Sequence, residues 1–253
     1  MKIMRTLIII PARLESKRLF QKPLVNLDGM PMIQRVFENL QRANIAPVWV
    51  AYDDDCIGNL FLESQRVKTG VCCSGTDRVA QALDIKKAWN QFDIVINVQG
   101  DTPILDTSVL SQLFIPFSLP EISVVTLICS FKRQSLRPEP SKVKAVCRAS
   151  PLSGYWECHD FKRTIDFPDP SFSYYHHWGI YAFRPEVLKQ FKTWDPSPKE
   201  QKEALEQLRF LDHGHSIWAA EVTNNSSYMC VDTLEDLKEV QDFLKKSSLN
   251  KTM

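Results

Sequence analysis

The sequence lacks the long apolar run, of roughly 18 residues, that a membrane-spanning helix requires. Its start, MKIMRTLIII, places cations before an apolar stretch as a signal peptide does, but the stretch is short and no small-residue cleavage site follows. Neither charge is in excess, with 31 Lys and Arg against 30 Asp and Glu, whereas nucleic-acid-binding domains are usually basic. We therefore expect a cytoplasmic protein that binds neither membranes nor nucleic acid.

Two common phosphate-binding signatures are also missing. The sequence contains neither G-x-x-x-x-G-K-[ST] nor G-x-G-x-x-G, which excludes a P-loop and a dinucleotide fingerprint. Any phosphate must then be held by side chains and loop amides. The seven cysteines include no C-x-x-C pair and stand mostly in apolar runs, which favours packed free thiols over redox or zinc roles.

The fold class follows from the order of the apolar patterns. Through about residue 115, strand and helix patterns alternate, which is typical of a doubly wound α/β layer with a mostly parallel sheet. We predict strands at 5–11, 47–52, 71–73 and 93–98 and helices at 31–43, 53–66, 74–89 and near 106–115. After residue 115 we predict a smaller β-rich region, with strands at 122–129, 143–148 and 178–184 and helices at 199–212 and 233–246. The region 132–171 is the least regular and is a candidate insertion or dimer arm.

Four cations follow the first predicted strand, namely Arg13, Lys17, Arg18 and Lys22. Ligands of open α/β sheets bind beyond the carboxyl ends of the strands, and clustered Arg and Lys side chains bind phosphate. The alternative is an ordinary solvated basic loop. The local pattern alone does not choose between the two.

The stretch CSGTDR offers a second candidate. Ser74 and Asp77 are able to cap the helix that follows, and Gly75 lets backbone amides approach a ligand such as an anion or a nucleobase. Taken alone, the stretch is better explained as a plain helix cap.

Two aspartates are candidates for holding a cation. Asp101 follows a strand in INVQGDTPIL, where a carboxylate is well placed to hold Mg²⁺ together with phosphates, although an Asp-Thr-Pro turn explains it equally. Asp232, in CVDTLEDL, either caps the last helix with Glu235 or is the second carboxylate of the same site. The acids at 53–55 are more simply explained as a helix N-terminus, with Asp53 as its N-cap.

Together these stretches resemble the CMP-sugar-acid synthetase family, and within it the 3-deoxy-D-manno-octulosonate (Kdo) cytidylyltransferases. The matching blocks are PARLESKRLFQKPL at 11–24, SGTDR at 74–78, NVQGDTP at 97–103, HWGIY at 177–181, PSP at 196–198 with LEQLR at 205–209, and VDTLEDL at 231–237. Thr102 departs from the family, which usually has an acidic residue there, and Phe20-Gln21 stands where the family usually has Pro-Gly. The family's Y-F-S-R strand corresponds to the divergent stretch GYWECHDFKRTIDF.

The resemblance implies a single domain, 1–253, in which 1–115 binds CTP and 116–253 binds the sugar acid and forms a homodimer. It implies transfer of CMP from CTP to Kdo for lipopolysaccharide synthesis, with Mg²⁺ held by Asp101 and Asp232. Catalytic roles fall on Arg13, Lys22, Asp101 and Asp232. The implied CTP-binding residues are Pro11, Ala12, Arg13, Ser16, Lys22, Ser74, Gly75, Thr76, Arg78, Gln99 and Gly100.

For the sugar acid the resemblance implies Gln99, Arg163, His177, Tyr181, Glu206 and Gln207. His159 is a rival to Arg163 for the sugar carboxylate. By residue type alone His177 would be a structural histidine, and only its place in HWGIY gives it a binding role. The alternatives are a cytidylyltransferase for another acid sugar, such as a sialic acid or a modified Kdo, or a non-catalytic nucleotide-binding relative.

Overall fold

The computed structural model describes residues 4–16, 18–131, 141–223 and 227–249. The chain forms two compact units from interleaved segments. The first, here called the β1 unit, comprises Arg5–Ala88, Asn97–Thr107 and Ser227–Met253. The second, here called the β8 unit, comprises Met1–Met4, Trp89–Ile96 and Ser108–Ser226. The units are therefore discontinuous in sequence, whereas the halves expected from the sequence were continuous.

The β1 unit is built on three parallel strands. Strand β1 (Thr6–Ala12) pairs with β4 (Val48–Tyr52), and β4 pairs with β5 (Arg66–Lys68). Leu7 to Ile10 are fully buried, as expected of a strand covered on both faces. Val98, just after β6 (Ile94–Asn97), donates its N–H to the carbonyl of Ile9 at 3.2 Å, so the chain from Asn97 onward begins beside β1.

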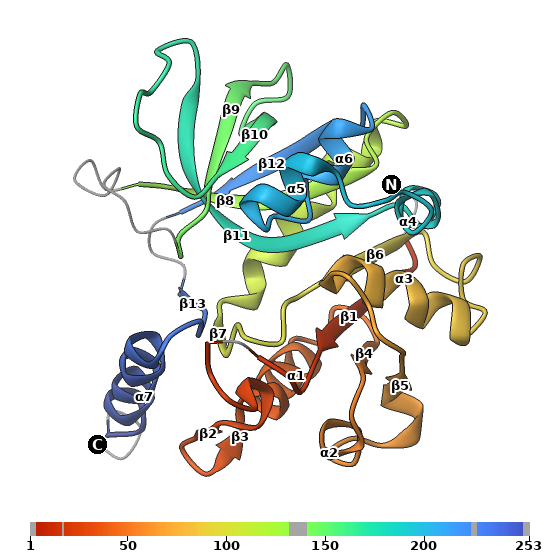
Figure 1. Ribbon diagram of the computed structural model, residues 1–253, viewed down its shortest axis with the longest axis vertical. Helices are drawn as coiled ribbons and strands as arrows, with labels where there is room; N and C mark the ends of the chain where they lie inside the picture. The colour runs from red at the N-terminus through yellow and green to blue at the C-terminus, as the bar shows by residue number, and fades with distance from the viewer. Residues whose placement is uncertain (1–3, 17, 132–140, 224–226, 250–253) are drawn as a thin grey trace. The chain divides into compact units, whose positions relative to one another are not determined.

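Three helices of the β1 unit agree with the sequence (Figure 1). Helix α1 (Met32–Ala43) buries the five apolar residues whose spacing predicted it, and Pro31 is its N-cap rather than its first residue. Helix α3 (Gly75–Ile85) begins after Ser74, whose hydroxyl accepts the N–H of Asp77 as predicted. Helix α7 (Leu234–Leu249) closes the chain.

Three predicted elements of the first 115 residues are wrong. The helix expected at 53–66 is only α2 (Asp55–Gly58) followed by a 3₁₀ turn, η2 (Glu63–Gln65). The strand expected at 71–73 is irregular, and Val71 is fully exposed, so its apolar run marks no core position. The segment near 106–115 is 3₁₀ (η3, Thr107–Leu113) rather than α-helical.

Short elements complete the β1 unit. They are η1 (Lys22–Leu24), the hairpin of β2 (Asn26–Leu27) with β3 (Met30–Pro31), and the antiparallel pair of β7 (Ile104–Leu105) with β13 (Tyr228–Met229).

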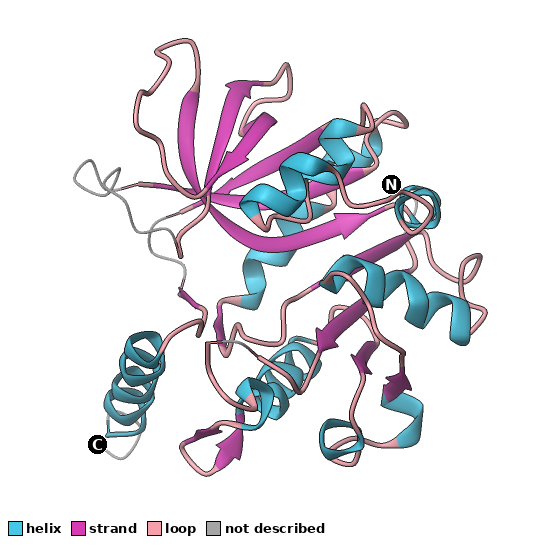
Figure 2. Ribbon diagram, viewed as in Figure 1, coloured by secondary structure: helices cyan, strands magenta, loops and turns pink. Residues whose placement is uncertain are grey.

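The β8 unit has a mixed sheet in the order β11-β8-β12-β10-β9, with β11 also pairing with β9. Its strands are β8 (Val124–Ser130), β9 (Lys144–Ala149), β10 (Tyr155–Lys162), β11 (Ser173–Phe183) and β12 (Ile217–Val222). Only β12 and β8 are parallel within this sheet. Its helical segments are η4 (Ile115–Ser118), α4 (Pro185–Phe191), α5 (Pro198–Glu203) and α6 (Leu208–Asp212), shown in cyan in Figure 2.

The sequence missed β12, and it missed β10 inside the region judged least regular, of which 132–140 lie outside the described residues. The single helix expected at 199–212 is split, because Ala204 has φ +52° and ends α5. A buried ion pair joins the two pieces. Both guanidinium nitrogens of Arg209 that contact Glu200 lie 2.6–2.7 Å from its carboxylate oxygens.

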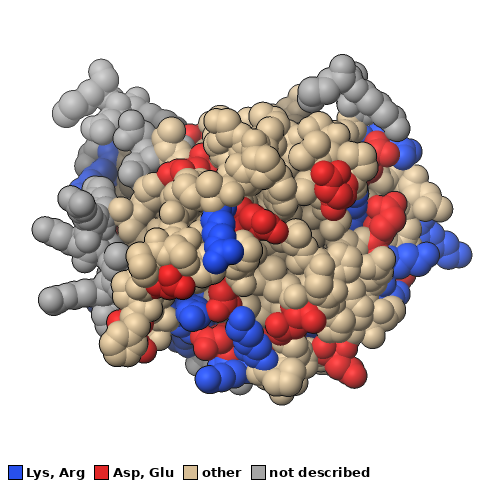
Figure 3. Space-filling model, turned by 90° about the horizontal axis from the view of Figure 1, so that it is seen from above, with Lys and Arg blue, Asp and Glu red and all other residues tan. Residues whose placement is uncertain are grey.

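The expected α/β class is thus present, with a mixed sheet. Among the described residues, no helix is both long and apolar enough to cross a membrane. On the face drawn in Figure 3, Lys and Arg side chains are interspersed with Asp and Glu, in keeping with the balanced composition. Cys147 and Cys158 are buried free thiols, as expected, but Cys56 and Cys73 are exposed.

Gln21 generates a stability prediction. It has φ +46°, in the left-handed region that costs a non-glycine residue about 1–2 kcal/mol and that glycine adopts without this cost. Gln21→Gly is expected to raise the free energy of unfolding by about 0.5–1 kcal/mol, since the greater entropy of glycine in the unfolded chain offsets part of the gain. Urea denaturation measures it. Gln34→Gly, the same change inside α1, should instead cost about 1 kcal/mol; a loss of similar size at both positions would contradict the strain argument.

Candidate functional site

Two distant segments of the β1 unit run antiparallel and bring Asp101 and Asp232 together. Met229 pairs with Ile104 in the β13–β7 ladder. The N–H of Val231 donates to the carbonyl of Asp101 at 2.9 Å, which extends the contact to the residue next to Asp232. Backbone hydrogen bonding therefore fixes the backbone positions from which the side chains of Asp101 and Asp232 extend.

An apolar cluster packs these segments against the cationic loop. Its buried members are Leu19, Leu27, Met32, Val231 and Val240, and the partly buried residues packed on them are Val25, Ile104, Met229, Leu237 and Leu244. Because the cluster joins the loop before η1, the β7–β13 pair and α7, burial of apolar surface holds together the three segments that carry Lys22, Asp101 and Asp232.

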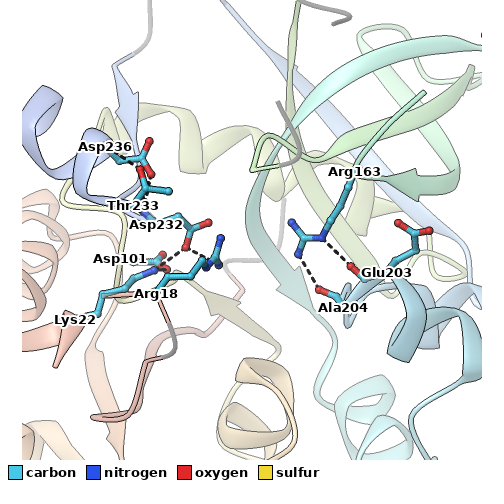
Figure 4. A network of polar contacts seen from close by, with 9 residues as sticks. All are labelled: Arg18, Lys22, Asp101, Arg163, Glu203, Ala204, Asp232, Thr233 and Asp236. Carbon is cyan, nitrogen blue, oxygen red and sulfur yellow. Dashed lines mark hydrogen bonds and ion pairs between the residues drawn. The ribbon is translucent and has the colours of Figure 1, made fainter. Parts of the chain in front are cut away.

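The ammonium of Lys22 lies between the two carboxylates (Figure 4). Its Nζ is 2.5 Å from Oδ2 of Asp101 and 2.8 Å from Oδ1 of Asp232. Burial alone would lower the pKa of Lys22, but the charges and hydrogen bonds of Asp101 and Asp232 outweigh it and raise that pKa above its ordinary value. Lys22 is therefore a fixed positive charge at this site.

Asp232 is not the cap of the last helix. The hydroxyl of Thr233 accepts the N–H of Asp236 at 3.2 Å, and the carboxylate of Asp236 accepts the N–H groups of Asp232 and Thr233 at 2.9 and 2.8 Å. This reciprocal pair satisfies the helix N-terminus without Asp232. The carboxylate of Asp232 instead contacts Lys22 and also Arg18, whose Nη2 is 3.0 Å from Oδ1 (Figure 4).

The turn that carries Asp101 lies tightly against the end of β1. A Cβ added to Gly100 would lie 2.8 Å from Cδ1 of Ile33 and 3.1 Å from the carbonyl oxygen of Pro11. A Cβ on Gly75 would lie 3.3 Å from the side chain of Gln99 and 3.4 Å from that of Pro11. The structure thus brings together four of the residues expected at the nucleotide, namely Pro11, Gly75, Gln99 and Gly100.

A chain of side-chain amides continues this arrangement. The amide of Gln99 donates to Oδ1 of Asn97 at 3.3 Å, and the amide of Asn97 donates to the hydroxyl of Thr76 at 3.4 Å. Asn97 and Thr76 are buried, so this chain links the end of β6 to the first turn of α3. Of the other expected nucleotide contacts, Ala12 is buried and Ser16 is half-buried.

Arg78 serves the loop itself. Its guanidinium is buried and donates to the hydroxyl of Thr69, to the carbonyl of Gly70 at 3.4 Å and to Oδ2 of Asp53 at 3.1 Å. These contacts tie α3 to the end of β4. The resemblance implies that Arg78 also binds CTP, and that role stays a prediction.

Asp53 was missed as a site residue. The helix cap predicted for it belongs to Asp54, whose side chain accepts the N–H of Cys56 at 2.8 Å. Oδ1 of Asp53 accepts the N–H of Leu14 at 3.0 Å, while Oδ2 binds Arg78. Asp53 therefore connects the loop after β1 to helix α3. No local signal distinguishes it from its two acidic neighbours.

The remaining cations of the loop differ in their surroundings. Arg13 is exposed and makes no hydrogen bond or ion pair with the residues that the structure describes, so its side chain is available to a ligand. Lys17 lies outside the described residues.

In the β8 unit, His177 and Tyr181 lie on β11 within an aromatic cluster. Their ring centroids are 5.2 Å apart, and His177 also contacts Phe161. The hydroxyl of Thr126 donates to the carbonyl of Ile180 at 2.7 Å, so it accepts from Nε2–H of His177 at 3.0 Å. Burial lowers the pKa of His177 to about 3 and keeps the ring neutral.

Tyr181 carries a signal that points to a ligand. Its hydroxyl is buried and finds no hydrogen-bond partner among the residues that the structure describes. Burial, and then the charge of Glu206, raises the pKa of Tyr181 well above the ordinary value. Gln207, beside Glu206, is buried at the N-cap of α6.

The two rivals for the sugar carboxylate differ in geometry. Arg163 follows β10 and donates from Nε to the carbonyl of Glu203 at 2.8 Å and from Nη2 to that of Ala204 at 3.1 Å (Figure 4). Its own carbonyl accepts from the buried ammonium of Lys144 at 2.9 Å. His159 is exposed on β10 and contacts the ring of Phe172. Arg163 is the more firmly positioned of the two.

A family model described as cytidylyltransferase matches residues 7–217. The chain belongs to the cytidylyltransferase family. It is 36% identical over 241 residues to the 3-deoxy-manno-octulosonate cytidylyltransferase of Dichelobacter nodosus (strain VCS1703A), which covers 92% of this chain and 95% of that protein. The enzyme of the same description from Rhodospirillum centenum (strain ATCC 51521 / SW) is 36% identical over 94% of this chain and 93% of its own length.

Solved structures agree with this membership. A CMP:2-keto-3-deoxy-manno-octonic acid synthetase complexed with CTP aligns with a TM-score of 0.81 and 33% identity, over 96% of this chain and 99% of that one. A putative glucose-1-phosphate thymidylyltransferase from Bacillus anthracis, at 17% identity and a TM-score of 0.63, shares the fold alone. The resemblance inferred from the sequence motifs is confirmed.

Gly100→Ala tests the close approach of the turn to β1. The added methyl group would press on the carbonyl of Pro11, which is backbone and cannot move aside as a side chain does. We expect a loss of about 1–3 kcal/mol in the free energy of unfolding, measured by urea denaturation. Gly70→Ala is the matched control, because its Cβ would meet nothing nearer than 3.7 Å. Equal effects at both glycines would refute the close approach.

The burial of neutral His177 predicts a pH dependence of stability. Between its ordinary pKa of 6.5 and its folded value of about 3, the unfolded chain binds a proton that the native protein does not. Stability should therefore fall as the pH drops through this window, by up to about 1.4 kcal/mol per pH unit from this group. His177→Gln, which keeps an N–H donor, should reduce this slope in urea denaturation between pH 4 and 6.5. The exposed His159→Gln should leave it unchanged, and an unchanged slope in His177→Gln would contradict the assignment.

Proposed function

We propose that the protein transfers the CMP group of CTP to the anomeric 2-hydroxyl of Kdo, releasing pyrophosphate, as a step of lipopolysaccharide synthesis. The observation that carries the proposal is the meeting of Lys22, Asp101 and Asp232 at one point beyond the parallel strands of the β1 unit. Ligands of open α/β sheets bind beyond the carboxyl ends of such strands. Relatives about one-third identical over nearly the whole chain are described as enzymes of this activity.

The carboxylate pair fits Mg²⁺. Asp101 and Asp232 each present an oxygen to a single cationic atom, at 2.5 and 2.8 Å. Among the described residues, no group of three or more His, Cys, Asp and Glu side chains is arranged to hold a metal. Two carboxylates are what Mg²⁺ takes from a protein when phosphates and water supply the other ligands. When bound, the ion would neutralise phosphate charge and lower the pKa of a coordinated hydroxyl.

The chemistry asks mainly for position and positive charge. The 2-hydroxyl oxygen of the sugar forms a bond to the α-phosphorus, the bond from that phosphorus to the pyrophosphate oxygen breaks, and the hydroxyl proton is lost. Arg13 and Lys22 would bind the triphosphate and offset the charge that grows on the departing pyrophosphate. Ser74, Gly75 and Thr76, at the first turn of α3, would lie against the nucleoside.

Residues of the β8 unit would hold the sugar acid. Tyr181 offers a buried hydroxyl with an unused donor, and the neutral ring of His177 lies beside it. Glu206 and Gln207 would accept and donate to sugar hydroxyls, and Arg163 would pair with the carboxylate. We also propose a homodimer, formed through the strands after residue 120, and a cytoplasmic location.

A second candidate is transfer of CMP to another acid sugar, such as a sialic acid or a modified Kdo. It is favoured by the divergence of 154–167 and by the guanidinium of Arg163, which already contacts two carbonyls of the protein. Pyrophosphate release from CTP and Mg²⁺, measured with Kdo, sialic acid and modified Kdo as acceptors, separates the two. Turnover of sialic acid but not of Kdo would overturn the preferred substrate. Absence of pyrophosphate release with all three acceptors would favour the non-catalytic relative that Thr102 suggests.

Asp101→Asn tests the role of the carboxylate pair. The variant keeps the shape of the side chain and removes one negative charge, so we expect kcat to fall at least about 100-fold, the effect of losing several kcal/mol of transition-state stabilisation. Circular dichroism and the melting temperature establish that the fold is retained. Asp55→Asn, which removes an exposed partner of Lys68, should leave kcat unchanged. A near-normal rate for Asp101→Asn would refute the metal role.

A further inference from the structure

Two cations contact the carboxylates of Asp101 and Asp232. Lys22 bridges the two carboxylates, and Arg18 contacts the same oxygen of Asp232 that Lys22 contacts. Only 13% of the Lys22 side chain is exposed, whereas 54% of that of Arg18 is, so Lys22 is the partner less screened by water.

The position of the Lys22 ammonium conflicts with that of a metal ion. Mg²⁺ binds carboxylate oxygens at about 2.0–2.1 Å, so an ion shared by Asp101 and Asp232 would lie in the space from which Nζ now donates to both carboxylates. Two cations cannot share that space, because their repulsion would exceed what either gains. Metal binding to both carboxylates therefore requires the ammonium to leave.

The movement open to Lys22 is that of its side chain. The backbone is held in η1, where Pro23 is buried and the N–H of Leu24 donates to the carbonyl of Gln21 at 2.8 Å. A lysine side chain is flexible, and its ammonium binds anions as a point charge. The triphosphate of the proposed substrate supplies the anionic oxygens toward which it would turn.

We propose that Lys22 acts as a placeholder for the metal, so that the carboxylate pair accepts a divalent cation only once a nucleotide has drawn the ammonium away. This rests on the proposed function. Under this proposal, bound nucleotide increases the affinity of the site for the metal. The free protein binds the metal weakly, while the triphosphate binds Lys22 even without the metal. The benefit is that Asp101 and Asp232 do not hold a tightly bound ion in a protein that lacks substrate.

The experiment measures Mn²⁺ binding to the free protein by electron paramagnetic resonance, since Mn²⁺ accepts the same oxygen ligands as Mg²⁺. We expect weak binding to the wild type without nucleotide, and at least a tenfold lower Kd in Lys22→Met, which keeps the length of the side chain and removes its charge. Arg18→Met should give a smaller change, because its contact is more exposed. Lys68→Met, which removes an exposed lysine paired with Asp55, is the matched control and should have no effect.

A second measurement uses the wild type alone and does not depend on how the variant folds. The Kd of Mn²⁺ is measured with and without a non-hydrolysable CTP analogue, and that of the analogue with and without EDTA. We expect the nucleotide to lower the Kd of Mn²⁺ at least tenfold and to bind detectably in EDTA. Lys22→Met should lose nucleotide affinity in EDTA.

Two results would overturn the placeholder role: micromolar binding of Mn²⁺ to the free wild type, or equal Mn²⁺ affinity in a folded Lys22→Met and the wild type. Either can occur while the enzyme still turns over CTP and Kdo. Failure of the proposed function would instead appear as absence of that turnover, so the two failures are distinguishable.

Discussion

The shared ammonium of Lys22 is the interaction on which this part of the molecule depends. The carboxylate oxygens of Asp101 and Asp232 lie within hydrogen-bond distance of one nitrogen, so they are at most about 5 Å apart, and without a cation their repulsion would be about 3 kcal/mol at an effective dielectric constant of 20. A cation between them converts that repulsion into attraction. The site is therefore stable only when occupied by positive charge, and the identity of that charge is free to change.

Rigid and mobile parts of the site are separated physically. Three features fix the backbone positions of Asp101 and Asp232. They are the pairing between β7 and β13, the apolar cluster behind these strands, and the contact of Gly100 with the end of β1. The two cations nearest to them, Lys22 and Arg18, are long side chains with several rotatable bonds. Such a division suits a reaction governed by the position of charges, because carboxylates stay in place while ammonium and guanidinium groups follow the phosphates.

The sequence predicted helices and strands well where one pattern of apolar residues extended over many positions. The buried run of β1 and the helical spacing of α1 each allow one assignment, and the structure has both. Prediction failed where the signal was short or local. Three apolar residues at 71–73 do not reveal that Val71 faces solvent, and a left-handed Ala204 inside a helical pattern has no signature, because alanine is the best helix former. Strand β10 was hidden because its polar and aromatic residues do not alternate cleanly.

The site was predictable as a set of residues and not as a set of contacts. The motifs placed Asp101 and Asp232 together through a family pattern, since no spacing rule relates residues so distant in the chain. The predicted cap of α7, Asp232 with Glu235, is one residue away from the observed cap, Thr233 with Asp236. The sequence did not choose between them, because both pairs have the spacing of a capping box. Because other residues form the cap, the carboxylate of Asp232 is left to contact Lys22 and Arg18, which lie more than two hundred residues away in the chain. These long-range ion pairs, rather than the local helix start, explain where the Asp232 carboxylate lies.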